Sequence, residues 1–192
     1  GVGLTVELVS ERSDVDRADD LLRLRHHEYF DQRMSIIIPF LGPVSQLTAL
    51  LGSLEPQLWA GDEIVVVAGG GSSDQGVVEL SARTRMVYSP EGRGRQLNRG
   101  VQEARGDLLW FLHADSTPTP NFAYHVRKLA LNQRYSLGCF RLAFRGDSRP
   151  LAAIARWANW RTEVLKLPYG DQGIFCRRLT FDQLNGFRRD YI

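Results

Sequence analysis

Apolar and polar positions alternate along most of the chain in blocks that are typical of strands and helices in turn. Short apolar or β-branched runs predict strands at residues 35–38, 63–67, 85–88, 108–112, 138–144 and 173–176. Apolar residues at helical spacing predict helices at 44–54, 75–83, 97–104, 121–132 and 151–167. Strands separated by helices of this length predict an α/β fold with a mostly parallel central sheet.

The first residues differ in character from the rest of the chain. Residues 10–20 carry charges of both signs, and residues 21–27 continue as a short charged helix. The strand-like segment MSIIIPF then begins at Met34. We therefore expect residues 1–33 to be a leader, a linker or the tail of an upstream domain, and residues 34–192 to form the main domain.

Composition adds one constraint on the ligand. A chain of 192 residues is long enough for one α/β domain and short for two. Its formal net charge of +2 is too small to indicate binding to nucleic acid. Four arginines nevertheless cluster in one segment, at Arg93, Arg95, Arg99 and Arg105. This cluster favours a local anionic ligand over a polymer, so we expect no nucleic-acid partner.

The cysteines and the apolar runs indicate the compartment. Cys139 and Cys176 lie far apart and lack the spacing of a zinc site, so we interpret them as small buried residues in a reducing cytosol. No run approaches the roughly 20 apolar residues of a membrane span, and the N-terminus has no secretory apolar segment. The sequence therefore predicts a soluble cytoplasmic protein.

Four loops follow predicted strands. Ligands of open parallel sheets bind at the carboxyl ends of the strands, and the loops expected there are residues 39–43, 69–74, 92–98 and 113–117. The glycine-rich segment VVVAGGGSSDQ, residues 65–75, lacks the lysine of a P-loop and the glycine spacing of a dinucleotide-binding loop. A solvent-exposed turn remains an alternative for this segment alone, but the convergence of the four loops predicts a ligand site.

The fourth predicted strand runs into polar residues in the sequence LLWFLHADS, which places His113 and Asp115 at the sheet edge. A carboxylate there can hold Mg²⁺ or Mn²⁺ against a diphosphate, because hard cations prefer oxygen ligands and leave positions open for substrate phosphates. The alternative is that Asp115 caps the turn before Thr117.

Several motifs, in this order, carry a resemblance to a known family. They are SIIIP, GGSSD, GRGRQLNRGVQEARGDLLWFLHADS, GCFRLAF, YGDQGIFCRR and LNGFR. From about residue 34 onward the chain resembles family 2 glycosyltransferases of the GT-A fold, and within them a small bacterial subgroup with LHADT and YGDQ-type motifs. The resemblance implies a Rossmann-like, three-layer α/β/α fold. It also implies metal-dependent, inverting transfer of a sugar from a UDP- or GDP-linked donor to an unknown acceptor.

The resemblance also assigns site residues. It implies that Asp115 binds Mg²⁺ or Mn²⁺, that Arg95 and Asn98 contact the nucleotide or its phosphates, and that the turn after the second strand lies near the nucleoside. The full set implied for nucleotide-sugar binding is Pro39, Gly70, Ser72, Asp74, Gly94, Arg95, Asn98, His113, Ala114 and Asp115. Asp171 of YGDQ is the candidate catalytic base or acceptor-site group, and the alternative is that it fixes the turn after Gly170.

Three departures from the family pattern keep other functions open. Residues 40–43 lack the usual acidic position, and Ala68 and Gly69 stand where an aspartate usually reads the base. The acidic pair that often follows the GGF-type motif is absent before Ile192, so we expect the domain to be truncated at its C-terminus. The alternatives are a degenerate GT-A domain that binds a nucleotide or a partner without catalysis, and a nucleotidyltransferase-like enzyme.

Two further segments carry weaker expectations. Residues 1–33 resemble the C-terminal end of another GT-A-like transferase, which implies a fused upstream domain, with a charged surface helix as the alternative. Trp157 and Trp160 are three residues apart and share a helix face. We expect them to pack in the core, with stacking on a sugar or peripheral contact with the inner membrane as alternatives.

Overall fold

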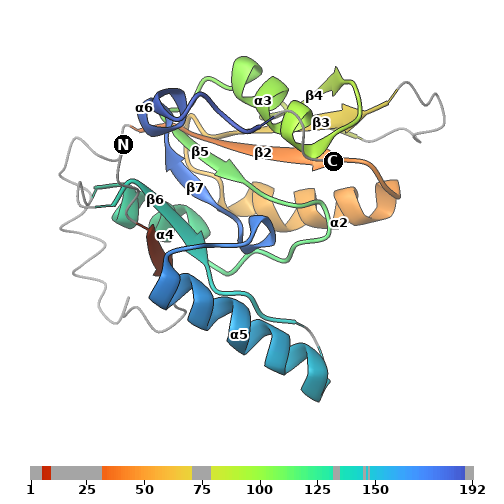
Figure 1. The fold of residues 1–192 in the computed structure, drawn as a ribbon. Coiled ribbons are helices and arrows are strands. Elements are labelled where there is room, and N and C mark those ends of the chain that lie inside the picture. The colour runs from red at the N-terminus through yellow and green to blue at the C-terminus, as the bar shows by residue number, and fades with distance from the viewer. Residues whose placement is uncertain are drawn as a thin grey trace.

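A computed structural model of the chain describes residues 6–9, 32–70, 79–131, 135–144, 146 and 148–188. Seven strands form one sheet in the order β1-β6-β7-β5-β2-β3-β4 (Figure 1). They are β1 (Val6–Val9), β2 (Met34–Phe40), β3 (Glu63–Gly69), β4 (Thr84–Ser89), β5 (Leu108–Phe111), β6 (Leu137–Phe140) and β7 (Phe175–Arg177). The helices are α2 (Val44–Leu54), η2 (Glu55–Gln57), α3 (Arg93–Glu103), α4 (Phe122–Leu131), α5 (Arg149–Leu165), η3 (Gly170–Gln172) and α6 (Arg178–Gln183).

The sheet is mostly parallel, as the sequence predicts. β2 pairs in parallel with β3 and β5, β3 pairs in parallel with β4, and β1 pairs in parallel with β6. Only β7, among the described strands, runs in the opposite direction, because it is antiparallel to both β5 and β6. The carboxyl ends of β2, β3, β4 and β5 therefore meet at one edge of the sheet, which is where ligands bind in such folds.

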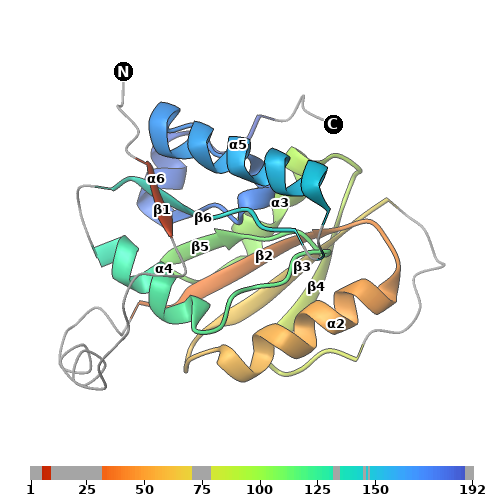
Figure 2. The same cartoon turned by 90° about the horizontal axis from the view of Figure 1, so that it is seen from below.

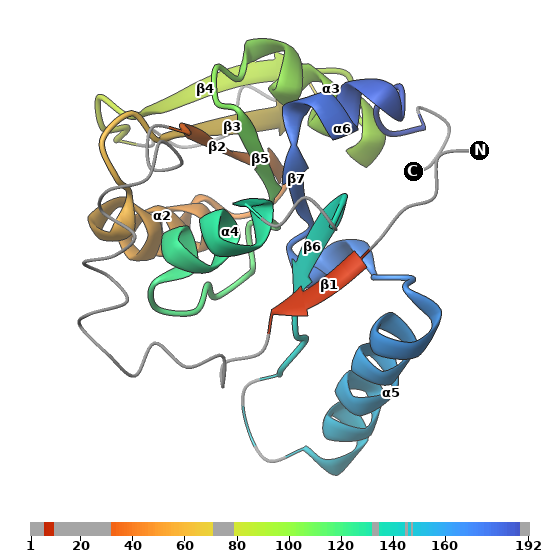
Figure 3. The same cartoon turned by 90° about the vertical axis from the view of Figure 1, so that its left-hand side faces the viewer.

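Helices cover both faces of the sheet, which gives the three layers (Figures 2 and 3). Ile36 and Ile38 of β2 pack toward α2 and α4, whereas Ile37 packs toward α3 and α6. All three side chains are fully buried. Buried parallel strands are apolar on both faces for this reason, and it explains why the second and fourth predicted strands are continuous apolar runs.

Two sequence-predicted elements differ from the structure. The helix expected at 75–83 is absent from its described part, because residues 79–83 are not helical, and residues 71–78 lie outside the described residues. The strand expected at 138–144 ends at Phe140. Beyond it the amide of Asn159 takes the place of a neighbouring strand, because its Oδ1 accepts from the Leu142 N–H at 2.8 Å and its Nδ2 donates to the Leu142 carbonyl at 2.9 Å.

Strand β1 is an addition to the predicted elements. It lies at the edge of the sheet, with Val6 opposite Leu137 and Val9 opposite Phe140 of β6. Residues 10–31, which join it to the main domain, lie outside the described residues. That residues 1–33 are a leader, a linker or the tail of an upstream domain stays a prediction.

The two cysteines are buried, as the sequence predicts. Cys139 and Cys176 are both buried and neither forms a disulfide. Burial raises the pKa of the Cys176 thiol to about 12, so this thiol is protonated at neutral pH. Both therefore serve as small apolar residues of the sheet.

Candidate active site

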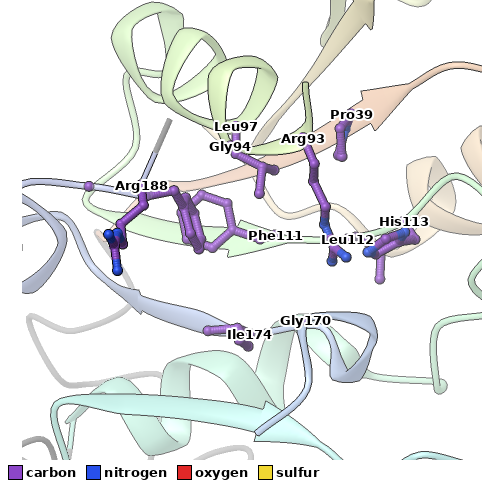
Figure 4. Close-up of a pocket in the computed structure, with 12 residues that line it drawn as sticks. Pro39, Arg93, Gly94, Leu97, Phe111, Leu112, His113, Gly170, Ile174 and Arg188 are labelled. Atoms are coloured by element: carbon purple, nitrogen blue, oxygen red, sulfur yellow. The ribbon is translucent and has the colours of Figure 1, made fainter. Parts of the chain in front are cut away.

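A pocket of about 560 Å³ lies beside the carboxyl ends of β2 and β5. Its walls come from the end of β2, the first turns of α3, the end of β5, the segment from η3 to β7, and the segment after α6 (Figure 4). The lining residues are Pro39, Arg93, Gly94, Leu97, Phe111, Leu112, His113, Gly170, Ile174, Gly186, Phe187 and Arg188. Arg93 and His113 lie together at one end, and Arg188 lies at the other.

Arg93 is the first residue of α3, and its guanidinium group extends across the pocket to η3. It lies so close to Gly170 that a β-carbon at that glycine would be 2.6 Å from the Arg93 Nη2 atom. Burial lowers the pKa of Arg93, and the carboxylates of Asp171 and Asp115 oppose this shift. Arginine keeps its proton in proteins, so a half-buried cation lies within electrostatic reach of these two carboxylates.

His113 follows β5 and stands beside this cation. Burial lowers the pKa of its imidazole, Arg93 lowers it further, and Asp115 and Asp171 oppose both effects. The ring is therefore neutral at neutral pH. Its Nε2 atom is buried and has no hydrogen-bond partner among the described residues. A buried polar atom without a partner is uncommon and indicates a missing ligand, water or ion.

The residues at this end of the pocket fit a divalent cation that a bound substrate would share. No cluster of three or more His, Cys, Asp or Glu side chains suited to a metal ion occurs within the described part of the chain. Mg²⁺ typically takes only one or two protein carboxylates together with substrate phosphates. Asp115 is exposed and is not a lining residue of the pocket, but its carboxylate is close enough to influence the pKa of His113. This carboxylate and the unpartnered Nε2 of His113 provide such an incomplete donor set.

The structure places the other predicted site residues unequally. Three of them, Pro39, Gly94 and His113, line the pocket, whereas the others do not line it or lie outside the described residues. Gly70 directly follows β3 and has a φ of +75°, a conformation that favours glycine. Ala114 lies between His113 and Asp115 in the loop after β5. Ser72 and Asp74, which the sequence assigns to the nucleoside, lie outside the described residues.

Asn98 and Arg95 lie on α3 but do not line the pocket. The carboxamide of Asn98 instead holds the backbone of Phe187, because its Nδ2 donates to the Phe187 carbonyl at 2.8 Å and its Oδ1 accepts from the Phe187 N–H at 2.9 Å. Arg95 is exposed. The structure thus uses Asn98 to fix one wall of the pocket, and it brings Arg93 rather than Arg95 to the carboxylates.

Arg93 belongs to the arginine cluster but is not among the site residues that the resemblance implies, although the periodicity of the helix points to it. Leu97 was expected on the buried face of the helix, and Arg93 lies four residues earlier, on the same face. Arg95 lies two residues before Leu97 and therefore points elsewhere. The helical spacing of the GRGRQLN motif distinguishes the two arginines once the helix is known to begin at Arg93.

Gln96 fills the space beside Gly69, the last residue of β3 and one of the two positions where family members usually have an aspartate. Its buried Nε2 donates to the carbonyls of Phe40 at 3.2 Å and Val67 at 2.8 Å, and so links the ends of β2 and β3. A β-carbon at Gly69 would lie 2.9 Å from the same Nε2 atom. An aspartate at Gly69 would therefore collide with the amide that joins the two strands.

Replacing Gln96 with Leu is expected to lower the free energy of unfolding by about 1–3 kcal/mol, because two buried carbonyls lose their donor. Urea denaturation measures the change. Gln102→Leu, at an exposed position of the same helix, is the matched control and should change the free energy of unfolding by less than about 0.5 kcal/mol. Equal losses in the two variants would contradict the role of Gln96.

Comparison with known proteins supports the predicted family and fold. The model of glycosyl transferase family 2 matches residues 35–181. No match was found among curated proteins. Mannosyltransferase PcManGT from Pyrobaculum calidifontis, solved in complex with GDP-Man and Mn²⁺, has a TM-score of 0.60 at 19% identity, covering 83% of this chain and 48% of that chain.

Two further solved structures have the same fold. Glucosyl-3-phosphoglycerate synthase from Mycobacterium tuberculosis, in complex with Mn²⁺, UDP-Glc and phosphoglyceric acid, has a TM-score of 0.61 at 16% identity, covering 92% of this chain and 66% of that chain. S. aureus TarS 1-349 has a TM-score of 0.58 at 16% identity, covering 82% of this chain and 51% of that chain. The chain thus spans between 48% and 66% of the length of these three structures.

These similarities confirm the GT-A fold that the motifs imply. The matched segment runs from the start of β2 into α6. It therefore includes Arg93, His113 and Asp115. Since the family model matches more than half of the sequence, the chain belongs to glycosyl transferase family 2.

Proposed function

We propose that this chain forms the donor-binding part of a metal-dependent, inverting glycosyltransferase. The donor is a UDP- or GDP-linked sugar, and the acceptor is unidentified. One observation carries the proposal: a half-buried arginine and a histidine with an unpartnered buried nitrogen lie together at one end of a pocket, and the carboxylate of Asp115 is close enough to influence the pKa of both. An anionic ligand that brings a cation with it satisfies all three groups at once.

Arg93 is the residue that we assign to the donor diphosphate. It forms no ion pair within 4.0 Å in the described part of the chain, although two carboxylates influence its pKa. Guanidinium groups bind phosphate oxygens through paired, charge-assisted hydrogen bonds. Its place at the N-terminus of α3 adds a second attraction, since helix N-termini favour anions.

Asp115 would hold Mg²⁺ or Mn²⁺ at this end of the pocket, with the Nε2 atom of His113 as a second donor. When bound, the ion would stabilise the negative charge of the diphosphate leaving group. Arg93, as a fixed cation nearby, would orient the same phosphates. The solved structures of PcManGT and of the glucosyl-3-phosphoglycerate synthase contain Mn²⁺ together with a nucleotide sugar, which supports this assignment.

Asp171 is the acidic group that we assign to the acceptor side, either as the base that deprotonates the acceptor hydroxyl or as an acceptor-binding group. The neighbouring Gln172 makes the hydrogen bonds that hold this turn: its Oε1 accepts from the Tyr169 N–H at 2.7 Å and from the Thr162 hydroxyl at 2.9 Å. Asp171 is exposed and has no hydrogen bond or ion pair among the described residues. Its carboxylate is therefore not required to fix the turn.

One observation favours a second candidate, a domain that binds a nucleotide without catalysis. Ala68 is fully buried, and a side chain at position 69 would require the amide of Gln96 to move. The strand end thus offers no carboxylate to read the base, which predicts weak discrimination between UDP and GDP. A chain that binds both nucleotides equally and never transfers or hydrolyses a donor sugar would support this candidate over the enzyme.

Replacing Arg93 with Ala is expected to weaken the binding of UDP or GDP in the presence of Mn²⁺ by about 1.5–3 kcal/mol, because charge-assisted hydrogen bonds to the phosphates are lost. Isothermal titration calorimetry measures this change. Arg95→Ala removes the same charge from an exposed position two residues away and should change the affinity by much less. Equal effects of the two substitutions, or no binding of either nucleotide to the unmodified chain, would overturn the proposal.

A further inference from the structure

Helix α5 exposes large apolar side chains on the side that faces away from the sheet. Its buried side is made of small and polar residues, namely Ala155, Ala158, Asn159 and Thr162. The outward side, which we call the α5 apolar face, consists of Ile154, Trp157, Trp160, Val164, Leu165 and the following Leu167. The exposed fractions of Trp157 and Trp160 are 55% and 51%, so the expectation that they pack in the core is wrong.

This pattern is unusual for a helix at the surface of a soluble domain. A surface helix normally turns its apolar stripe toward the core and its polar residues toward water. In α5 the small residues face the protein and the large apolar residues face outward, at the periphery of the molecule beyond β6 (Figures 1 and 3). Contiguous apolar surface of this kind marks a site of interaction with a protein or a membrane.

The α5 apolar face is held in position by its own side chains and by the domain. The Arg161 guanidinium lies 3.9 Å from the centre of the Tyr169 ring and 6.0 Å from that of Trp157, and its Nε donates to the Leu167 carbonyl at 3.1 Å. Thr162 joins the helix to the YGDQ turn through its hydrogen bond to Gln172 at 2.9 Å. These contacts therefore hold the helix that carries the exposed tryptophans in a fixed position on the domain.

Most of the charged residues on α5 and at its C-cap are basic. Arg149, Arg156, Arg161 and Lys166 lie on α5 or at its C-cap, and Glu163 is the only acidic residue of the helix. Glu163 is paired with Arg141. The outward side of α5 thus combines tryptophans and aliphatic residues with an excess of basic groups. This composition is typical of helices that lie at the surface of a membrane.

We propose that the α5 apolar face docks on the surface of an anionic lipid bilayer. Tryptophan rings reside favourably at the boundary between headgroups and acyl chains, and aliphatic side chains enter that boundary. Basic residues near the surface are attracted by anionic headgroups. The contact is peripheral, since the described part of the chain contains no helix long and apolar enough to cross a membrane.

Charge favours a bilayer over a second copy of the chain. In a two-fold symmetric contact the same surface is present on both sides. Two copies that met through α5 would bring Arg149, Arg156 and Lys166 of one copy near the same residues of the other. An anionic surface neutralises these charges instead of repelling them. This inference does not depend on the proposed enzymatic function, because it rests on a separate helix.

Vesicle flotation with the full 192-residue chain tests the proposal. We expect the chain to float with vesicles of phosphatidylglycerol and phosphatidylcholine, to bind vesicles of phosphatidylcholine alone much less, and to show a blue shift of tryptophan emission on binding. The double substitution Trp157→Ser, Trp160→Ser should lower the partition coefficient at least about tenfold, because the apolar contact is lost. Arg149→Glu with Arg156→Glu should remove the preference for phosphatidylglycerol.

Tyr88→Ser and Leu179→Ser are matched controls, because both residues are at least as exposed as the tryptophans but lie on β4 and α6. They should leave vesicle binding unchanged. Circular dichroism of each variant verifies that it remains folded. Failure of the unmodified chain to bind phosphatidylglycerol vesicles, or unchanged binding by the tryptophan double variant, would overturn the proposal. So would a concentration-dependent dimer that the tryptophan substitutions dissociate while vesicle binding is absent.

Discussion

Replacing Asp115 with Asn is expected to abolish the Mn²⁺-dependent part of nucleotide binding and to lower the rate of sugar transfer by about a thousandfold, since a bound metal ion contributes several kcal/mol of charge stabilisation. The substitution keeps the size of the side chain and removes its charge. The loss of this carboxylate would leave the metal ion with few protein ligands, because no cluster of three potential metal-binding side chains occurs among the described residues. The Nε2 atom of His113, the second donor that we assign to the ion, has no charge to replace that of the carboxylate.

Thermal denaturation with UDP or GDP, with and without Mn²⁺, measures the first part of this prediction. The unmodified chain should be stabilised by the nucleotide and Mn²⁺ together, and Asp115→Asn should not. Asp107→Asn is the matched control: Asp107 directly precedes β5, at the opposite end of the same strand, and it is exposed. A metal-dependent stabilisation that persists in Asp115→Asn would exclude Asp115 as the metal ligand.

Replacing Asp62 with Ala is expected to lower the free energy of unfolding by about 3–5 kcal/mol, because it leaves a buried arginine without its partner. The side chains of Asp62 and Arg127 are 0% and 4% exposed. The Asp62 carboxylate also accepts the backbone N–H groups of Met34 and Trp59, each at 2.9 Å. Its removal therefore disturbs the start of β2, the strand that carries Pro39 to the pocket.

Chemical denaturation of Asp62→Ala measures this loss against Glu103→Ala. Glu103 pairs with Arg99 on the surface of α3, where the two side chains are 35% and 43% exposed. Such exposed pairs contribute at most about 1 kcal/mol. The whole stability of a domain is about 5–15 kcal/mol, so the Asp62 variant should unfold at a much lower denaturant concentration. A loss no larger than that of Glu103→Ala would show that the buried pair is not a stabilising element.

The alternation of strands and helices could be predicted from the sequence, because each buried strand is a continuous apolar run and each helix has apolar residues at helical spacing. β2, β3 and β5 lie close to their predicted positions for this reason. β6 ends early because an asparagine on α5, the next element in the chain, takes the place of its partner. The strand β1 depends on pairing with β6, more than a hundred residues away, and local patterns contain no information about such a partner.

Part of the candidate site could also be predicted from the sequence. Loops that follow parallel strands converge on one edge of the sheet, so the meeting of Pro39, Gly94 and His113 around one pocket follows from the strand order. The choice of Arg93 over Arg95 depends on where α3 begins. The use of Asn98 depends on the backbone of Phe187, which is brought to α3 only by the fold.

The fold class and the family could be predicted from the amino-acid sequence, because apolar periodicity and short motifs are local properties of the chain. The three-dimensional fold was needed to know which side chains share the pocket, that the Gln96 amide fills the space beside Gly69, and which face of α5 is exposed. These features are set by distances between segments far apart in the sequence. An amphipathic pattern places Trp157 and Trp160 on one face, but what covers that face depends on how the rest of the chain packs.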